Sequence, residues 1–87
     1  MSYSILFEFE AKEQLKRFDR SIQLQILKKV VQMETKASAR HLKFGTEFFV
    51  EEIGQYRIAF KVEEQLLEKR IYFIGKHKDY EKWYKKP

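Results

Sequence analysis

The sequence contains no cysteine, one proline and only three glycines among its 87 residues. Without cysteine the chain has no disulfide, no zinc–thiolate site and no thiol nucleophile, which is typical of proteins of the reducing cytoplasm. The low glycine and proline content excludes collagen-like and linker-like chains. Apolar runs are also short, and none approaches the roughly 20 residues that a membrane-spanning helix requires. We therefore expect a soluble, cytoplasmic protein.

Apolar residues make up 44% of the sequence and include eight Phe, five Tyr and one Trp. That content is sufficient for a small hydrophobic core, so a disordered chain is not expected. No internal repeat or low-complexity linker divides the chain, and its length corresponds to roughly one domain. The sequence therefore predicts that residues 1–87 form a single domain.

The positive charge is unevenly distributed along the chain. Eighteen Lys and Arg against 13 Asp and Glu give a net charge of +5. Residues 76–87 contain five Lys and two acidic residues, so this end carries three of the five net charges. A basic surface favours polyanions, acidic proteins or anionic membranes as partners.

Hydrophobic periodicity in the first 34 residues predicts a strand followed by two helices. Tyr3, Ile5, Phe7 and Phe9 recur at every second position, which indicates a strand with one buried face. The period then becomes helical, with a break near Asp19 or Ser21, because either side chain can cap a helix N-terminus. The positions expected to be buried on this helical hairpin are Ala11, Leu15, Phe18, Ile22, Ile26, Leu27, Val30 and Met33.

The second half of the chain predicts three more strands, at residues 48–53, 56–62 and 69–74, with turns at 54–55 and 63–67. We expect Gly75 to end the last strand and a short helix to follow around residues 79–85. Three strands joined by short turns indicate an α+β fold with a mostly antiparallel sheet of about four strands, covered by the helical hairpin. Alternation in the middle strand places Arg57 on the face opposite the aromatic core.

Two segments resemble the RelE/ParE toxin superfamily. Gly54-Gln55-Tyr56-Arg57-Ile58 is similar to its G-x-Y-R-I/V strand, and residues 74–80, IGKHKDY, are similar to its terminal G-H/K-R-x-x-x-x-Y segment. The second segment is closer still to the T-H-x-E-Y-D ending of the HigB branch, in which His replaces Arg. The resemblance implies a ribosome-dependent mRNA endonuclease that is the toxin of a type II toxin–antitoxin pair.

The resemblance also implies roles for individual residues. Metal-independent RNA cleavage needs a base, an acid and a cation for the charge that develops on the phosphate. Arg57 matches the arginine that holds the scissile phosphate, unless it pairs with Glu51 or Glu52 instead. His77 matches the HigB-type acid or base, and Tyr80 matches the tyrosine that stacks on a base or supplies a proton. Tyr84 is an alternative to Tyr80, since the RelE-type tyrosine lies further along the chain.

Basic residues are the candidates for contacts with mRNA and ribosomal RNA. Lys76, Lys78 and Lys82 belong to the C-terminal run, together with Lys85 and Lys86, and Arg40, His41 and Lys43 lie in the loop before the sheet. We expect Trp83 to cover the core. The sequence departs from the family in one strand, because the positions usually occupied by Arg or Lys are Val50 and Glu52. Either the loop bases compensate, or Glu51 or Glu52 acts as the general base, or nuclease activity is impaired.

Two other functions remain open at the sequence level. A ParE-like inhibitor of DNA gyrase shares the fold without cleaving RNA, and a toxin-derived protein without activity could still bind an antitoxin or nucleic acid. The resemblance implies an acidic, helical or partly disordered antitoxin as partner, and the basic surface is consistent with one. With two His and no Cys, the sequence contains no recognisable metal-ligand set, so we expect no metal cofactor.

Overall fold

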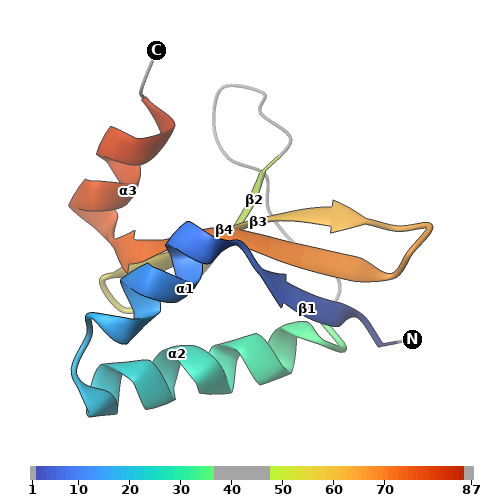
Figure 1. Cartoon of the computed structure of the whole chain (residues 1–87), viewed down its shortest axis with the longest axis horizontal. Coiled ribbons are helices and arrows are strands. Elements are labelled where there is room, and N and C mark those ends of the chain that lie inside the picture. The colour runs from blue at the N-terminus through green and yellow to red at the C-terminus, as the bar shows by residue number, and fades with distance from the viewer. Residues whose placement is uncertain (1, 37–47, 86–87) are drawn as a thin grey trace.

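The computed structural model describes residues 2–36 and 48–85. Their elements are β1 (Ser4–Phe7), α1 (Phe9–Lys16), α2 (Arg20–Met33), β2 (Phe49–Ile53), β3 (Tyr56–Glu63), β4 (Glu68–Lys76) and α3 (His77–Tyr84). The strands form one sheet in the order β1-β4-β3-β2, in which β1 runs parallel to β4 and the other neighbours are antiparallel. The predicted α+β architecture, with a helical hairpin and a mostly antiparallel sheet, is confirmed (Figure 1).

The break between α1 and α2 is defined by side-chain caps, and of the two candidates, Asp19 and Ser21, it is Asp19 that caps α2. The Asp19 carboxylate accepts a hydrogen bond from the backbone N–H of Ile22 at 3.1 Å, which satisfies a donor at the start of α2. Gln23 donates from its side-chain amide to the Phe18 carbonyl at 2.8 Å, beyond the end of α1. These contacts fix the turn of the hairpin. No helix within the described ranges is long and apolar enough to cross a membrane.

The main core lies between this hairpin and one face of the sheet. Its fully or nearly fully buried members are Ala11, Ile26, Val30, Met33, Ile58, Phe60, Ile71 and Ile74. Two expectations for this core are wrong. Phe9 is 78% exposed, because β1 ends at Phe7 and the chain turns into α1, and Leu27 is 40% exposed at the edge of the buried stripe of α2.

The C-terminal end of α2 is held by a buried lysine. Lys69 of β4 has no exposed surface, and its Nζ donates to the carbonyl oxygens of Met33 at 2.8 Å and Lys36 at 2.6 Å. Burial lowers the pKa of Lys69, and the carboxylates of Glu51 and Glu64 oppose that shift. The last carbonyls of a helix lack partners within the helix. Lys69 belongs to a strand, and its side chain therefore caps the C-terminal end of α2.

A second, aromatic cluster lies on the opposite face of the sheet, beneath α3. Ala59, Phe73 and Tyr80 are buried there, and Trp83 of α3 stacks on Phe73 with ring centroids 5.2 Å apart. Phe48 meets Trp83 edge-to-face at 5.0 Å. The expectation that Trp83 covers the core is confirmed, but Trp83 covers this second cluster and not the main core.

Gly75 does not end β4, contrary to the expectation. The strand continues to Lys76, with Gly75 opposite Arg57 in the β3–β4 ladder. A Cβ at position 75 would lie 2.7 Å from Cζ of Phe73, so the glycine makes room for the ring that α3 packs against. The helix then begins directly at His77, two residues earlier than expected.

Candidate functional site

Arg57 lies on the sheet face that α3 covers, directly opposite Glu52 in the β2–β3 ladder. Its Nε is 3.7 Å from Oε2 of Glu52, so the expected alternative pairing with an acid of β2 is present. The Arg57 side chain is 15% exposed and that of Glu52 is 45% exposed. The prediction that Arg57 faces away from the main core is confirmed, but this face is occupied by the aromatic cluster and is not open.

The turn at Gly54 and Gln55 positions two of the predicted site residues. The guanidinium of Arg57 donates to the carbonyl oxygens of Gly54 at 2.8 Å and Tyr56 at 2.9 Å, which holds the side chain near the turn. The backbone N–H of His77 donates to the Gln55 carbonyl at 2.8 Å, so the first residue of α3 is attached to the same turn. Gly54 has φ of +55°, a conformation that favours glycine.

His77 is exposed on the first turn of α3 and pairs with a residue that the sequence analysis did not single out. Its Nε2 lies 3.4 Å from Oε1 of Glu81, one helical turn later. Such i, i+4 pairs are neighbours on a helix surface, so the predicted helix could have indicated this contact. Glu81 also lies 3.9 Å from Nζ of Lys85.

Tyr80 lies among the other residues of the candidate site. Tyr80 is 8% exposed, and its ring packs against Tyr84, with centroids 4.8 Å apart, and against Phe73 at 6.2 Å. Burial raises the pKa of Tyr80, Tyr84 raises it further, Arg57 lowers it, and the carboxylates of Glu52 and Glu81 raise it. Little of the ring is available for stacking on a base, but the protonated hydroxyl can donate a hydrogen bond.

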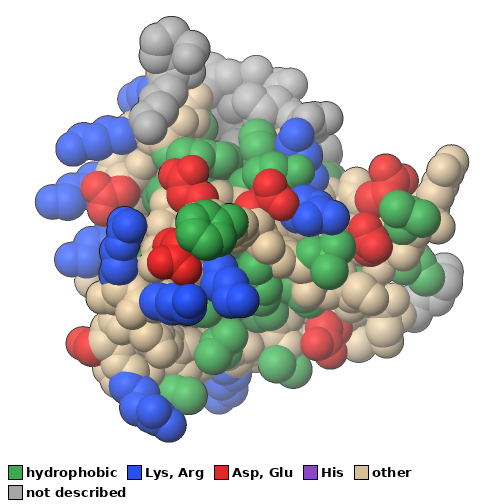
Figure 2. Space-filling view, in the orientation of Figure 1, with side chains coloured by type: hydrophobic (Ala, Val, Ile, Leu, Met, Phe, Trp, Pro, Cys, Tyr) green, Lys and Arg blue, Asp and Glu red, His purple; other side chains and the backbone are tan. Residues whose placement is uncertain are grey.

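Arg57, His77, Tyr80 and Tyr84 therefore come together from β3 and α3. Lys76, Lys78 and Lys82 are exposed on or beside α3, and Lys and Arg side chains project along the edge of the molecule where α3 lies (Figure 2). Arg40, His41 and Lys43 lie outside the described residues, so their contribution stays a prediction.

The two adjacent acids of β2 have different surroundings. Glu51 is buried on the side of the helical hairpin, where its Oε1 lies 3.1 Å from Nζ of Lys36 and 3.9 Å from Nζ of Lys29. Glu52 faces Arg57 on the other side, because neighbouring side chains of a strand point to opposite faces. Of the two acids, Glu52 is therefore the one that lies beside Arg57.

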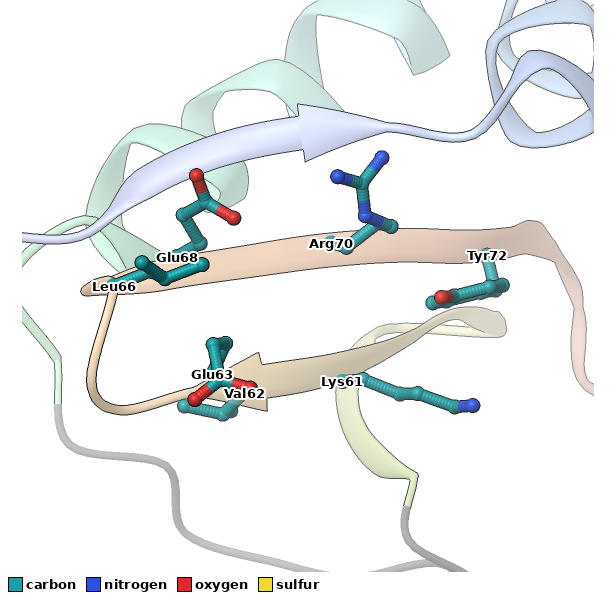
Figure 3. A pocket seen from close by; sticks show the side chains of 7 residues that line it. All are labelled: Lys61, Val62, Glu63, Leu66, Glu68, Arg70 and Tyr72. Atoms are coloured by element: carbon teal, nitrogen blue, oxygen red, sulfur yellow. The ribbon is translucent and has the colours of Figure 1, made fainter.

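A groove of about 390 Å³ lies farther along the sheet, at the β3–β4 hairpin (Figure 3). It is lined by Lys61, Val62, Glu63, Leu66, Glu68, Arg70 and Tyr72. Its cations already have contacts within the chain, because Lys61 lies over the ring of Tyr72 at 5.0 Å and Arg70 is 3.0 Å from Glu8. None of the predicted catalytic residues lines this groove, so it is separate from the cluster around Tyr80.

No protein-family model matches the sequence, and no curated protein matches it. Several solved structures, however, are similar to this chain. A double mutant of the E. coli toxin RelE in the free state aligns with a TM-score of 0.80 at 18% identity, covering 97% of this chain and 93% of that one. A RelBE toxin–antitoxin complex from Mycobacterium tuberculosis gives a TM-score of 0.75 at 15% identity and covers 87% of this chain and 92% of that one.

The RelE–RelB complex from Pyrococcus horikoshii OT3 gives a TM-score of 0.70 at 13% identity, and the alignment covers 88% of this chain and 97% of that one. The similarity therefore extends over nearly the whole length of both chains. At these identities the likeness concerns the fold, and it agrees with the resemblance carried by the two sequence motifs. The chain has the fold of the RelE toxins.

Proposed function

We propose that this protein is the toxin of a type II toxin–antitoxin pair and that it cleaves mRNA on the ribosome without a metal ion. The observation that carries the proposal is the convergence of Arg57, His77 and Tyr80 beneath and at the start of α3. The His77-x-x-Tyr80 spacing favours a HigB-like branch. Arg57 would stabilise the charge on the scissile phosphate, and the other two would exchange protons with the reacting oxygens.

The exposed lysines of α3 are suited to ribosomal RNA. Lys78 and Lys82 lie four residues apart, on one side of the helix, and their charges would contact phosphates without reading sequence. Binding through such contacts weakens steeply as salt concentration rises. We place the protein in the cytoplasm, where ribosomes and mRNA are available.

The proposed inhibitor is a cognate acidic antitoxin. The matching structures from Mycobacterium tuberculosis and Pyrococcus horikoshii are of complexes with antitoxin partners. The net charge of +5 favours an acidic partner for this chain too, and a partly disordered segment that folds on binding could cover a large surface.

Primer extension on ribosome-programmed mRNA tests the nuclease. We expect cuts within the translated frame that require ribosomes and that Arg57→Ala reduces on the order of a hundredfold. Arg57→Lys keeps the charge but loses the planar fork, so it should restore only part of the activity. Arg70→Ala is the matched control, because it removes an arginine from the same sheet at a distance from Tyr80. Equal cutting by wild type and Arg57→Ala would contradict the assignment.

The ion pair between Arg57 and Glu52 supports a second candidate. An arginine already paired with a carboxylate is less available to phosphate, which suits a ParE-like protein that inhibits DNA gyrase and cleaves no RNA. Growth arrest with intact mRNA, together with gyrase cleavage complexes on supercoiled plasmid, would select this function over the nuclease.

A further inference from the structure

We propose that a pocket between α1, β4 and α3 receives a nucleobase of the mRNA beside the cut, an inference that rests on the nuclease function proposed above. The end of β4 leads into α3 next to α1, and the three elements line the pocket (Figure 1). Its volume is about 290 Å³. Its lining includes Gln14 of α1, Arg17 and Phe18 directly after α1, Phe73 and Gly75 of β4, and Asp79 of α3.

The pocket lies on the α1 side of β4, across the strand from Arg57. Gly75 is the direct partner of Arg57 in the β3–β4 ladder, and neighbouring strands lie about 4.8 Å apart. Asp79 precedes Tyr80 in α3, so the pocket adjoins the candidate site through both elements. A phosphate held by Arg57 would therefore place the base of an adjoining nucleotide within reach of the pocket.

Aromatic rings give the pocket an apolar lining that neighbouring side chains hold in place. Phe73 is nearly buried, and Trp83 stacks on its ring with centroids 5.2 Å apart. Phe18 is half-buried and meets the Tyr56 ring edge-to-face at 5.3 Å. Aromatic side chains are the usual surfaces on which proteins stack unpaired RNA bases. Glycine at position 75 adds no side chain that would fill this space.

Three polar side chains of the pocket are suited to reading the edge of a base. Gln14 accepts the backbone N–H of Ile74 through its Oε1 at 2.8 Å, which leaves the N–H donors of its amide for a ligand. Arg17 and Asp79 are exposed, and within residues 2–36 and 48–85 neither has an ion-pair partner, although both line the same pocket. A base that carries an acceptor beside a donor can bridge these two side chains.

The carboxylate of Asp79 would select among bases, because an ionised carboxylate accepts hydrogen bonds and cannot donate one. Adenine, cytosine and guanine each carry an exocyclic amino group that can donate to it. Uracil carries carbonyl oxygens instead, and the carboxylate would repel them. Arg17 and Gln14 then donate to the ring nitrogen or carbonyl oxygen beside the amino group. The pocket therefore accepts amino-bearing bases and discriminates against uracil.

The test compares single-turnover cleavage of ribosome-bound mRNAs that differ in one nucleotide, placed directly before or directly after the cut. At one of these positions we expect wild type to cut RNAs with adenine, cytosine or guanine roughly tenfold faster than RNA with uracil. Asp79→Asn keeps the size of the side chain, and its amide can donate to a uracil oxygen. The variant should therefore cut all four RNAs at similar rates. Poorer folding would lower the four rates equally, so a lost preference reports recognition and not stability.

Glu10→Gln is the matched control, because Glu10 and Asp79 are both exposed acids in the first turn of a helix. It should keep the wild-type preference. Equal wild-type rates on the four RNAs at both positions, or a preference that Asp79→Asn retains, would overturn the pocket and leave the nuclease function intact. Wild-type protein that leaves every RNA uncut would overturn the nuclease function and the pocket with it.

Discussion

The two faces of the sheet bury different kinds of side chain. The face under α1 and α2 packs mainly aliphatic residues, and its buried charged residues have partners: Lys69 donates to two carbonyl oxygens, and Glu51 lies beside two lysines. The face under α3 packs aromatic rings beside Arg57 and Glu52 at a partly exposed edge. We infer that the first face determines stability and that the second combines packing with chemistry, and the following changes test that division.

The largest effect on stability is expected from the buried lysine of the first face. Lys69→Ala removes a fully buried stem and leaves the carbonyls of Met33 and Lys36 without their donor, so unfolding should become easier by roughly 2–5 kcal/mol. Lys69→Met keeps the stem and should cost less. Urea unfolding measures both, with the exposed Lys28→Ala as control, expected within about 0.5 kcal/mol of wild type. A urea midpoint of Lys69→Ala equal to that of wild type would show that these hydrogen bonds add nothing to stability.

A smaller effect is expected beneath α3. Gly75→Ala places a Cβ 2.7 Å from the Phe73 ring, so the ring and the Trp83 stacked on it must move, at a cost of about 1–3 kcal/mol. Trp83 is the single tryptophan, so its fluorescence reports this packing directly. Gly54→Ala is the comparison: it strains a turn in open space and should lower stability without changing the emission. An unchanged spectrum for Gly75→Ala would refute the packing role.

The smallest expected effect is a change in stability at alkaline pH. Burial first, and then Tyr84, raise the pKa of Tyr80 above its ordinary value of 10.0, so the folded state favours the neutral phenol. The resulting stability is present below about pH 10 and is lost as pH rises through the folded pKa. Lys69 has a lowered pKa, so its contribution to stability changes with pH in the opposite direction. The informative quantity is therefore the difference in stability between wild type and Tyr80→Phe at each pH. That variant should lose less stability on alkalinisation than wild type; an identical decline would contradict the shift.

Local patterns were sufficient for the type and order of the elements, though not for all of their bounds, and for the face of Arg57. The period-2 alternation of β3 separates Arg57 from Ile58, and the cap at Asp19 spans only four consecutive residues, 19–22. The exposed positions of Phe9 and Leu27 were not predicted, because alternation continues by coincidence past the end of β1 and a buried stripe on a helix has edges that only packing defines.

The site was predicted less completely than the fold. Arg57, His77 and Tyr80 were predicted from the family resemblance, and they stay predictions as site residues, but the contacts of each depend on strand register and helix position. Glu52 could be distinguished from Glu51 only once the β2–β3 pairing was known, and Glu81 acquires its contact with His77 only because α3 begins at that residue. Long-range pairing of this kind is not encoded in any one segment.

The most direct test of this account measures cutting rate and melting temperature on the same preparations of wild type, Arg57→Ala and Ile58→Val. These neighbours of β3 face opposite sides of the sheet. We predict that Arg57→Ala cuts ribosome-bound mRNA on the order of a hundredfold more slowly and melts close to wild type. Ile58→Val should cut at the wild-type rate and lose about 0.5–1.5 kcal/mol of stability. Undiminished cutting by Arg57→Ala, or a loss that only follows its melting temperature, would contradict the account.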